Sequence, residues 1–336
     1  MKQKLLVVTI LSFILLGCAQ NKIPKLNGVS FVASSDSLQQ QQVNAIKNVN
    51  ANYAAIMPFG FIKSLNHPEI VHDTDRQWFG ETSKGAKQYI ELLHKDGIKV
   101  MMKPQIWIWH GEFTGNLKMP SEEEWKELES AYRDFILTYV YLAADLKVEV
   151  FCIGTELEQF VIQRPQFWKD LIKEIKTIYQ GKLTYAANWD EYKRVPFWED
   201  LDFIGVDAYF PISESKTPTM EEAKASWKLW KEELKRVSEK VDHPILFTEY
   251  GYRSVDFAGR EPWDSNHELP SLNFDAQNNL LESLYQEVWQ EPWFAGGFVW
   301  KWFINHETAG GIKDNQFTPQ NKPAETILKK YYTPQK

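Results

Sequence analysis

Two glutamates in this 336-residue sequence each follow a short apolar run, and together they could act as a pair of catalytic carboxyls. Glu156 follows the run 148–154, and Glu249 follows the run 244–248. Two carboxyls ~5–5.5 Å apart can hydrolyse a glycosidic bond by double displacement, because one protonates the leaving oxygen while the other attacks the anomeric carbon. At that separation the two charges push the pKa values apart, so one site can supply both protonation states. The residues therefore predict the chemistry of a retaining glycoside hydrolase.

Either glutamate on its own has a simpler structural interpretation. A lone carboxylate near the end of a strand most often caps a helix or pairs with a basic side chain at the surface. Two glutamates at the ends of two predicted strands favour catalysis, because catalytic groups gather at such positions. Glu158 is a rival to Glu156. We place Glu158 in the following loop or at the start of a helix, and we therefore rank it second.

The glutamates must be positioned by regular elements, and eight short runs rich in Val, Ile, Phe and Tyr are predicted to be strands. These runs lack the alternation of a half-exposed strand, which is typical of strands buried on both faces. They are residues 29–33, 53–58, 99–105, 148–154, 183–187, 203–209, 244–248 and 297–302.

Helical patterns separate most of these strands. One of them opens on Ser121 with acidic residues behind it, as in a capping box, and another ends before Gly97. The predicted helices are residues 37–50, 82–96, 121–146, 164–179, 219–240, 274–290 and 323–332, and the crossover 191–200 has room for only a turn of helix. Alternating strands and helices predict an α/β fold, a (β/α)8 TIM barrel, with an open doubly wound sheet as the alternative. In the barrel, both glutamates face the same mouth.

Glutamates at the ends of strands four and seven resemble those of clan A of the glycoside hydrolases, and Glu249 is followed here by Tyr250 and Gly251. Within that clan, Gly154-Thr155-Glu156 is similar to family 113, whose characterised members are mainly endo-β-1,4-mannanases. The likeness runs from Gly28-Val29-Ser30-Phe31 to the segment 297–302. The resemblance implies that Glu156 is the acid/base and Glu249 the nucleophile of a retaining endo-β-1,4-mannanase.

Thr155 departs from the pattern of the wider clan. Most clan families have Asn directly before the acid/base, where its amide contacts the sugar 2-hydroxyl, but the change agrees with the resemblance to family 113. Three alternatives stay open. The sugar could be another β-linked glycan such as a glucan, galactan or xylan, the chain could bind glycans without hydrolysing them, or it could be a structural or adhesion module.

Further polar and aromatic residues at the predicted strand ends could bind substrate. They are Lys103, Trp109, Asn188, Trp189, Tyr209 and Trp300. We expect Trp300 to stack on the sugar beside the scissile bond, Lys103 and Asn188 to bind hydroxyls, and Tyr209 to contact the nucleophile. For any single tryptophan, core packing is an equally good interpretation. We interpret Asp207 as structural and leave Trp263 and Trp293 unassigned between outer subsites and packing.

The first residues resemble a bacterial lipoprotein leader. Lys2 and Lys4 precede an apolar stretch that is too short to span a bilayer, and the stretch ends in Leu15-Leu16-Gly17-Cys18. This motif implies cleavage before Cys18 and lipidation of its thiol. We therefore predict a signal peptide over 1–17, a lipidated tether over 18–26 and a catalytic domain over 27–334. Ala19 favours the outer membrane or cell surface over the inner membrane, and the alternatives are an ordinary signal peptide or a buried apolar segment.

Composition limits the partners. A net charge of −7 argues against nucleic acid and against docking on anionic lipid through basic patches. The 14 tryptophans instead suggest surfaces that stack on the apolar faces of sugar rings, so that the expected partner is a polysaccharide or oligosaccharide. Cys152 lies in an apolar run and has no disulfide framework around it. No metal-binding, phosphate-binding or dinucleotide-binding motif is present, and we predict a monomer without cofactor or metal.

Overall fold

The structure is a computed structural model that describes residues 24–266 and 271–334. The predicted signal peptide and Cys18 lie outside the described residues. Within the described ranges, no helix combines the length and the apolar character that crossing a bilayer requires.

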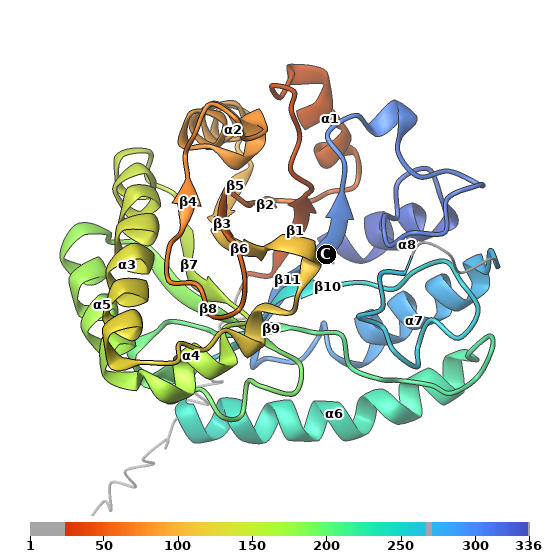
Figure 1. Ribbon diagram of the computed structural model, residues 1–336. Coiled ribbons are helices and arrows are strands. Elements are labelled where there is room, and N and C mark those ends of the chain that lie inside the picture. Colours follow the sequence, from red (N-terminus) through yellow and green to blue (C-terminus); the bar gives the residue numbers. More distant parts are fainter. Residues whose placement is uncertain (1–23, 267–270, 335–336) are drawn as a thin grey trace, which may run out of the picture.

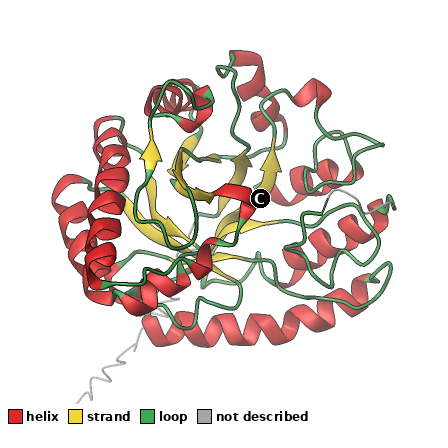
Figure 2. Cartoon of the chain, viewed as in Figure 1, coloured by secondary structure: helices red, strands yellow, loops and turns green. Residues whose placement is uncertain are grey.

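In the part of the chain that the structure describes, eight parallel strands close into a barrel with helices around it (Figures 1 and 2). The strand order around the barrel is β1-β11-β10-β9-β8-β7-β5-β2, and β1 pairs with β2 to close it. This confirms the predicted (β/α)8 barrel and excludes the open sheet. The strands are β1 (Leu26–Phe31), β2 (Tyr53–Ile56), β5 (Lys99–Met102), β7 (Val150–Thr155), β8 (Lys182–Asn188), β9 (Ile204–Asp207), β10 (Ile245–Tyr250) and β11 (Phe294–Trp302).

The helices begin where the sequence offers caps. The Ser121 hydroxyl accepts a hydrogen bond from the Glu124 amide at 3.2 Å, and Thr82 and Thr219 cap two further helices in the same way. The fifth crossover contains a single 3-10 turn, η4 (Trp198–Asp200), as predicted. The α-helices are α1 (Gln40–Asn48), α2 (Ser83–Lys95), α3 (Glu122–Asp145), α4 (Glu158–Gln163), α5 (Pro165–Ile178), α6 (Met220–Val241), α7 (Phe274–Glu287) and α8 (Pro323–Tyr332).

The inside of the barrel changes from apolar to polar along the strands. Met101 and Leu246 belong to a buried apolar cluster in the barrel. Two residues further along the chain, Lys103, directly after β5, and Thr248, within β10, are fully buried. Asp207 is buried beside them. A polar layer thus lies directly beneath the barrel mouth, where the carboxyl ends of the strands open.

A small additional sheet at the barrel mouth was not expected from the sequence. It consists of β4 (Val71–His72), β3 (Phe59–Ile62) and β6 (Gln105–Ile108), in that order. The predicted strand 99–105 is wrong in its extent, because the chain breaks at Pro104, which has no amide hydrogen to donate to a ladder. We call β4, β3 and β6 the mouth sheet.

Candidate active site

Glu156 and Glu249 line the same cavity at the barrel mouth, which has a volume of about 710 Å³. The strands that carry them lie three places apart around the barrel, so the closed fold brings together residues that are distant in sequence. Among the other predicted site residues, Asn188, Trp189, Tyr209 and Trp300 also line this cavity. Trp109 is 61% exposed but is not part of the lining.

The backbone holds Glu156 in an uncommon conformation. Glu156 directly follows β7, and the register between β7 and β8 shifts just before it. Its φ is +50°, in the left-handed region that few residues other than glycine adopt. The Glu156 amide donates to the carbonyl of Ala186 at 2.8 Å, and the Thr114 hydroxyl donates to the Glu156 carbonyl at 3.1 Å. Such locally strained backbone is found preferentially at functional sites.

The surroundings of Glu156 favour its protonated form. Burial raises the pKa of Glu156 well above its ordinary value, and the negative charges of Asp207 and Glu249 raise it further. The ammonium group of Lys103 acts in the opposite direction without cancelling this shift. A carboxyl that keeps its proton near neutral pH can donate that proton to a leaving group.

Glu249 is held differently. Its residue is 9% exposed, and both of its carboxylate oxygens have a donor. The Tyr209 hydroxyl donates to Oε1, as the sequence predicted for Tyr209, and the Lys103 ammonium lies 3.0 Å from Oε2. Two donors, one of them cationic, fix the orientation of the Glu249 carboxylate.

Lys103 and Asp207 form a buried ion pair at the floor of the cavity, which Asp207 lines. The Lys103 ammonium lies 3.1 Å from each oxygen of Asp207, and the Thr248 hydroxyl donates to Asp207 at 2.7 Å. Burial raises the pKa of Asp207 to about 6, against the opposing effect of Lys103. Burial disfavours the charge of Lys103, but Asp207 and Glu249 outweigh it and raise the lysine pKa. The structure thus places the Lys103 ammonium on carboxylates, whereas the sequence pointed to sugar hydroxyls.

Glu158 lies apart from this group. It is the first residue of α4, which confirms the predicted helix start, and it forms an ion pair with Arg194. It does not line the cavity. Its carboxylate therefore has a structural partner, in contrast to Glu156.

Glu191 connects the two loops that follow β7 and β8. The Tyr185 hydroxyl donates to Glu191 at 2.8 Å and accepts a hydrogen bond from the Leu157 amide at 2.6 Å. The Asn188 amide donates to the other carboxylate oxygen of Glu191 at 3.0 Å. Burial raises the pKa of Glu191 to about 7. This network fixes the backbone directly after Glu156 and beside Asn188.

Glu191→Gln should change the pH dependence of stability. Because the pKa of Glu191 is raised on folding, from 4.5 to about 7, the folded state binds more protons in that window, and wild-type stability falls as pH rises through it. The difference in unfolding free energy between the wild type and Glu191→Gln should therefore change with pH. We expect the wild type to lose up to about 3 kcal/mol relative to the variant between pH 4.5 and 8. Urea unfolding at several pH values measures this. Glu239→Gln, at an exposed position on α6, is the control, and parallel curves for wild type and Glu191→Gln would contradict the expectation.

Aromatic side chains beyond those predicted to bind substrate complete the walls of the cavity. Trp189 stacks on Trp263, with ring centroids 5.3 Å apart and planes at 14°. Trp107 and Phe113 also line the cavity. Trp107 points there because strand alternation turns Ile106 and Ile108 into the core, a pattern visible in the sequence once β6 is recognised. Trp293, the other unassigned tryptophan, packs against the core.

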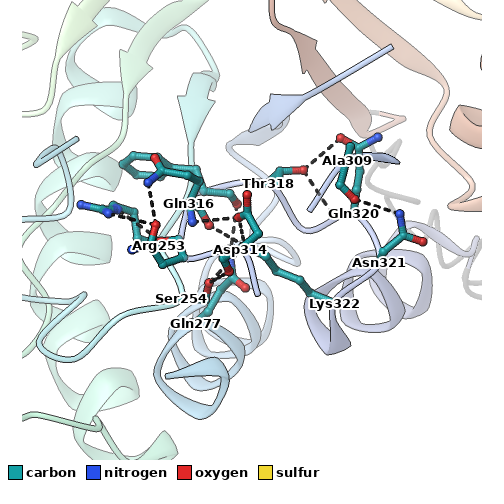
Figure 3. A network of polar contacts seen from close by, with 12 residues as sticks. Arg253, Ser254, Gln277, Ala309, Asp314, Gln316, Thr318, Gln320, Asn321 and Lys322 are labelled. Atoms are coloured by element: carbon teal, nitrogen blue, oxygen red, sulfur yellow. Dashed lines mark hydrogen bonds and ion pairs between the residues drawn. The ribbon is translucent and has the colours of Figure 1, made fainter. Parts of the chain in front are cut away.

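The loops after β10 and β11 support the wall that contains Phe317 (Figure 3). The Lys322 ammonium pairs with Asp314 at 2.7 Å and donates to the Ser254 hydroxyl at 3.0 Å and to the Gln316 carbonyl at 2.7 Å. Burial lowers the pKa of Lys322 to about 8. The network fixes the residue preceding Phe317 and so holds that ring at the cavity. Within residues 24–266 and 271–334, no group of His, Cys, Asp and Glu is arranged to hold a metal ion.

Comparison with known proteins gives a family match. The sequence profile of Glycoside Hydrolase Family 113 matches residues 33–322. A GH113 β-mannanase from Alicyclobacillus acidocaldarius, solved in complex with ManMIm, superposes with a TM-score of 0.80 at 24% identity, over 92% of this chain and 97% of that one. A GH113 β-1,4-mannanase complex gives 0.78 at 19% identity, over 93% and 100%. A β-glucuronidase from Ruminococcus gnavus gives 0.60 at 16% identity, over 92% and 50%. A search of curated proteins found no match.

Proposed function

The chain belongs to glycoside hydrolase family 113, and on that basis we propose that it is a retaining endo-β-1,4-mannanase that cleaves internal bonds of mannan-type polysaccharides. The observation that carries the proposal is the unequal environment of the two carboxyls in one cavity. Glu156 is kept protonated by burial and by neighbouring negative charge, whereas Glu249 has a cation and a hydroxyl on its two oxygens. Double displacement requires such an unequal pair, with a proton donor on one side and an oriented nucleophile on the other.

In the first step, Glu249 attacks the anomeric carbon and forms an ester bond to it. The glycosidic C–O bond breaks at the same time, and Glu156 gives its proton to the departing oxygen. Glu156 is then ionised, and the charges of Glu249 and Asp207 no longer both oppose it, because Glu249 has become an ester.

In the second step, Glu156 takes a proton from a water molecule, and the water oxygen attacks the anomeric carbon. The ester bond breaks, Glu249 is released as a carboxylate, and Glu156 regains its proton. Lys103 and Tyr209 stabilise the returning negative charge on Glu249. Two inversions at one carbon give net retention of configuration.

The substrate assignment rests on the family and on the two solved mannanases of that family to which the fold is similar. A panel of mannan, glucomannan, cellulose, xylan and galactan with analysis of product lengths tests it. We expect a mixture of manno-oligosaccharides early in the reaction, as internal cleavage requires. Hydrolysis confined to another glycan would contradict the mannanase assignment, and binding without hydrolysis would contradict the enzymatic one.

Lys103→Met should lower kcat by about 10²-fold, because the charge on Glu249 loses its cationic partner. The basic side of the pH profile of kcat/KM should also move to higher pH, because the Lys103 ammonium no longer lowers the pKa of Glu156. Steady-state kinetics across the pH range measures both effects. Lys228→Met, at an exposed position on α6, is the matched control, and an unchanged profile in Lys103→Met would contradict this role.

We further propose that the mature chain is anchored to the cell envelope through lipid on Cys18, at the outer membrane or cell surface. The lipobox-like sequence Leu15-Leu16-Gly17-Cys18 supports this. Cys18→Ala should move the protein from the membrane fraction to the soluble fraction and abolish incorporation of labelled palmitate. A wild-type protein that carries no label would contradict the anchor, whatever its catalytic activity.

A further inference from the structure

The mouth sheet has one exposed face that carries aromatic residues. In the register of its three strands, Phe61 lies opposite Trp107 on β6 and opposite Val71 on β4. Residues paired in this way point to the same face of a sheet. Trp107 is 50% exposed, Val71 is 46% exposed, and Phe61 is partly exposed. We call Phe61 and Trp107, together with the aliphatic Val71 at the outer end, the aromatic row.

The opposite face of the mouth sheet is buried. Gly60, Ile62 and Ile106 alternate with the exposed residues and are buried on the face toward the barrel body. Gly60 allows a close approach there, because a Cβ at this position would lie 2.7 Å from Ile70 and 3.1 Å from the ring of Phe135 on α3. The sheet is therefore fixed to the body of the barrel, and only the face with the aromatic row is open to a ligand.

The aromatic row is continuous with the catalytic cavity. Trp107 and Gln105 both line the cavity, and Phe61 and Val71 extend outward from Trp107 across two strand spacings. Strands in a sheet are about 4.8 Å apart, so the row reaches about 10 Å beyond the cavity wall. That length is comparable to a disaccharide.

The barrel order shows on which side of the carboxyls this row lies. Strands β8 and β9 separate β7 from β10 on one side, and β5, β2, β1 and β11 separate them on the other. A sugar chain that passes between Glu156 and Glu249 must therefore cross from the β8–β9 side to the β5–β2 side. Strand β3 directly follows β2 in the chain and strand β6 directly follows β5, so the mouth sheet is connected to the barrel on the β5–β2 side.

Each side of this path carries aromatic rings. The stacked pair of Trp189 and Trp263 comes from the loops after β8 and β10, which flank β9. The aromatic row comes from the segments that follow β2 and β5. The two groups thus stand at opposite ends of a path whose middle is the carboxyl pair.

We propose that the mouth sheet is a binding platform for the substrate chain, on which the aromatic row stacks sugar rings that lie beyond the cavity on the β5–β2 side. The proposal rests on the proposed function, since it assigns the path of the same chain. Pyranose rings joined by β-1,4 bonds present flat apolar faces to such side chains. Gln105, beside Trp107 on the same face, offers an amide to hydroxyl groups at the inner end of the row.

Chain-length dependence tests the platform. The variants are Trp107→Ala and Phe61→Ala, and the control is Tyr141→Ala, which removes a 58% exposed aromatic ring from the outer helix α3. For wild type and variants, kcat/KM is measured on mannohexaose and on an aryl β-mannobioside with a good leaving group. We expect Trp107→Ala to lose about tenfold on mannohexaose and less than about twofold on the short substrate, with Tyr141→Ala unchanged on both.

Binding separates the platform from the proposed chemistry. In a Glu249→Gln background, calorimetry with mannohexaose and mannobiose should show the same selective, about tenfold loss for the long chain in Trp107→Ala. Equal affinities for mannohexaose in Glu249→Gln and in the double variant Glu249→Gln/Trp107→Ala would overturn the platform, even if mannan is hydrolysed. Thermal unfolding verifies that both proteins are folded. If the wild type hydrolyses no mannan, the proposed function fails, and the same length comparison on cello-oligosaccharides or xylo-oligosaccharides still decides whether the aromatic row binds a β-1,4 chain.

Discussion

Glu249→Ala is expected to reduce kcat on mannan by at least about 10⁴-fold, because the anomeric carbon then has no nucleophile at the position that Lys103 and Tyr209 define. Asp207 is not expected to take over, because it is already paired to Lys103 and Thr248 at the cavity floor. Initial rates on mannan over long incubations measure the loss.

Glu249→Gln keeps the shape of the side chain and should be as inactive as the alanine variant, while thermal unfolding verifies that both fold. Glu291→Ala provides a glutamate control outside the cavity and should retain wild-type rates. Near-wild-type turnover by Glu249→Ala would contradict the assignment of the nucleophile.

Glu156→Ala should give a different pattern that depends on the leaving group. On mannan, kcat is expected to fall by about 10²–10⁴-fold, because the departing oxygen receives no proton. On a dinitrophenyl glycoside, whose leaving group needs no proton, the first step should stay fast, and the glycosyl-enzyme should accumulate because its hydrolysis lacks a general base. Azide, which needs no deprotonation to attack, should restore turnover and give a β-glycosyl azide.

The pH profile gives a second readout for Glu156. Since burial and neighbouring charge raise the pKa of Glu156, wild-type activity should decline on the basic side as this carboxyl loses its proton. That basic limb should be absent from Glu156→Ala acting on the dinitrophenyl substrate. Glu158→Ala is the matched control, because Glu158 is close in sequence but paired with Arg194. Azide rescue of Glu158→Ala instead would contradict the assignment.

The sequence was sufficient to predict the barrel and the shared cavity of the two glutamates. Buried parallel strands form unbroken apolar runs, and such runs place Glu156 and Glu249 at strand ends without any knowledge of tertiary contacts. The short fifth crossover and the caps at Ser121 and Thr219 are also local signals, and the structure agrees with them.

What the sequence could not show depends on tertiary contacts. The strands of the mouth sheet are two to four residues long, too short for a periodic pattern, and they exist because they pair with one another and pack against α3. The partners of Lys103 likewise come from β9 and β10, which no local pattern connects to it. The choice between Trp107 and Trp109 as a cavity residue followed from the register of β6 rather than from residue type.

The most direct test of the mechanism is to trap its covalent intermediate. A mannobiosyl fluoride with fluorine in place of the 2-hydroxyl of the reacting sugar should slow both steps, the second more severely. We expect the mass of the protein to increase by one fluorinated mannobiosyl group, and peptide mapping should place that group on Glu249. Attachment to any other residue, or steady turnover of mannan with inverted configuration in the first product, would contradict double displacement at Glu249.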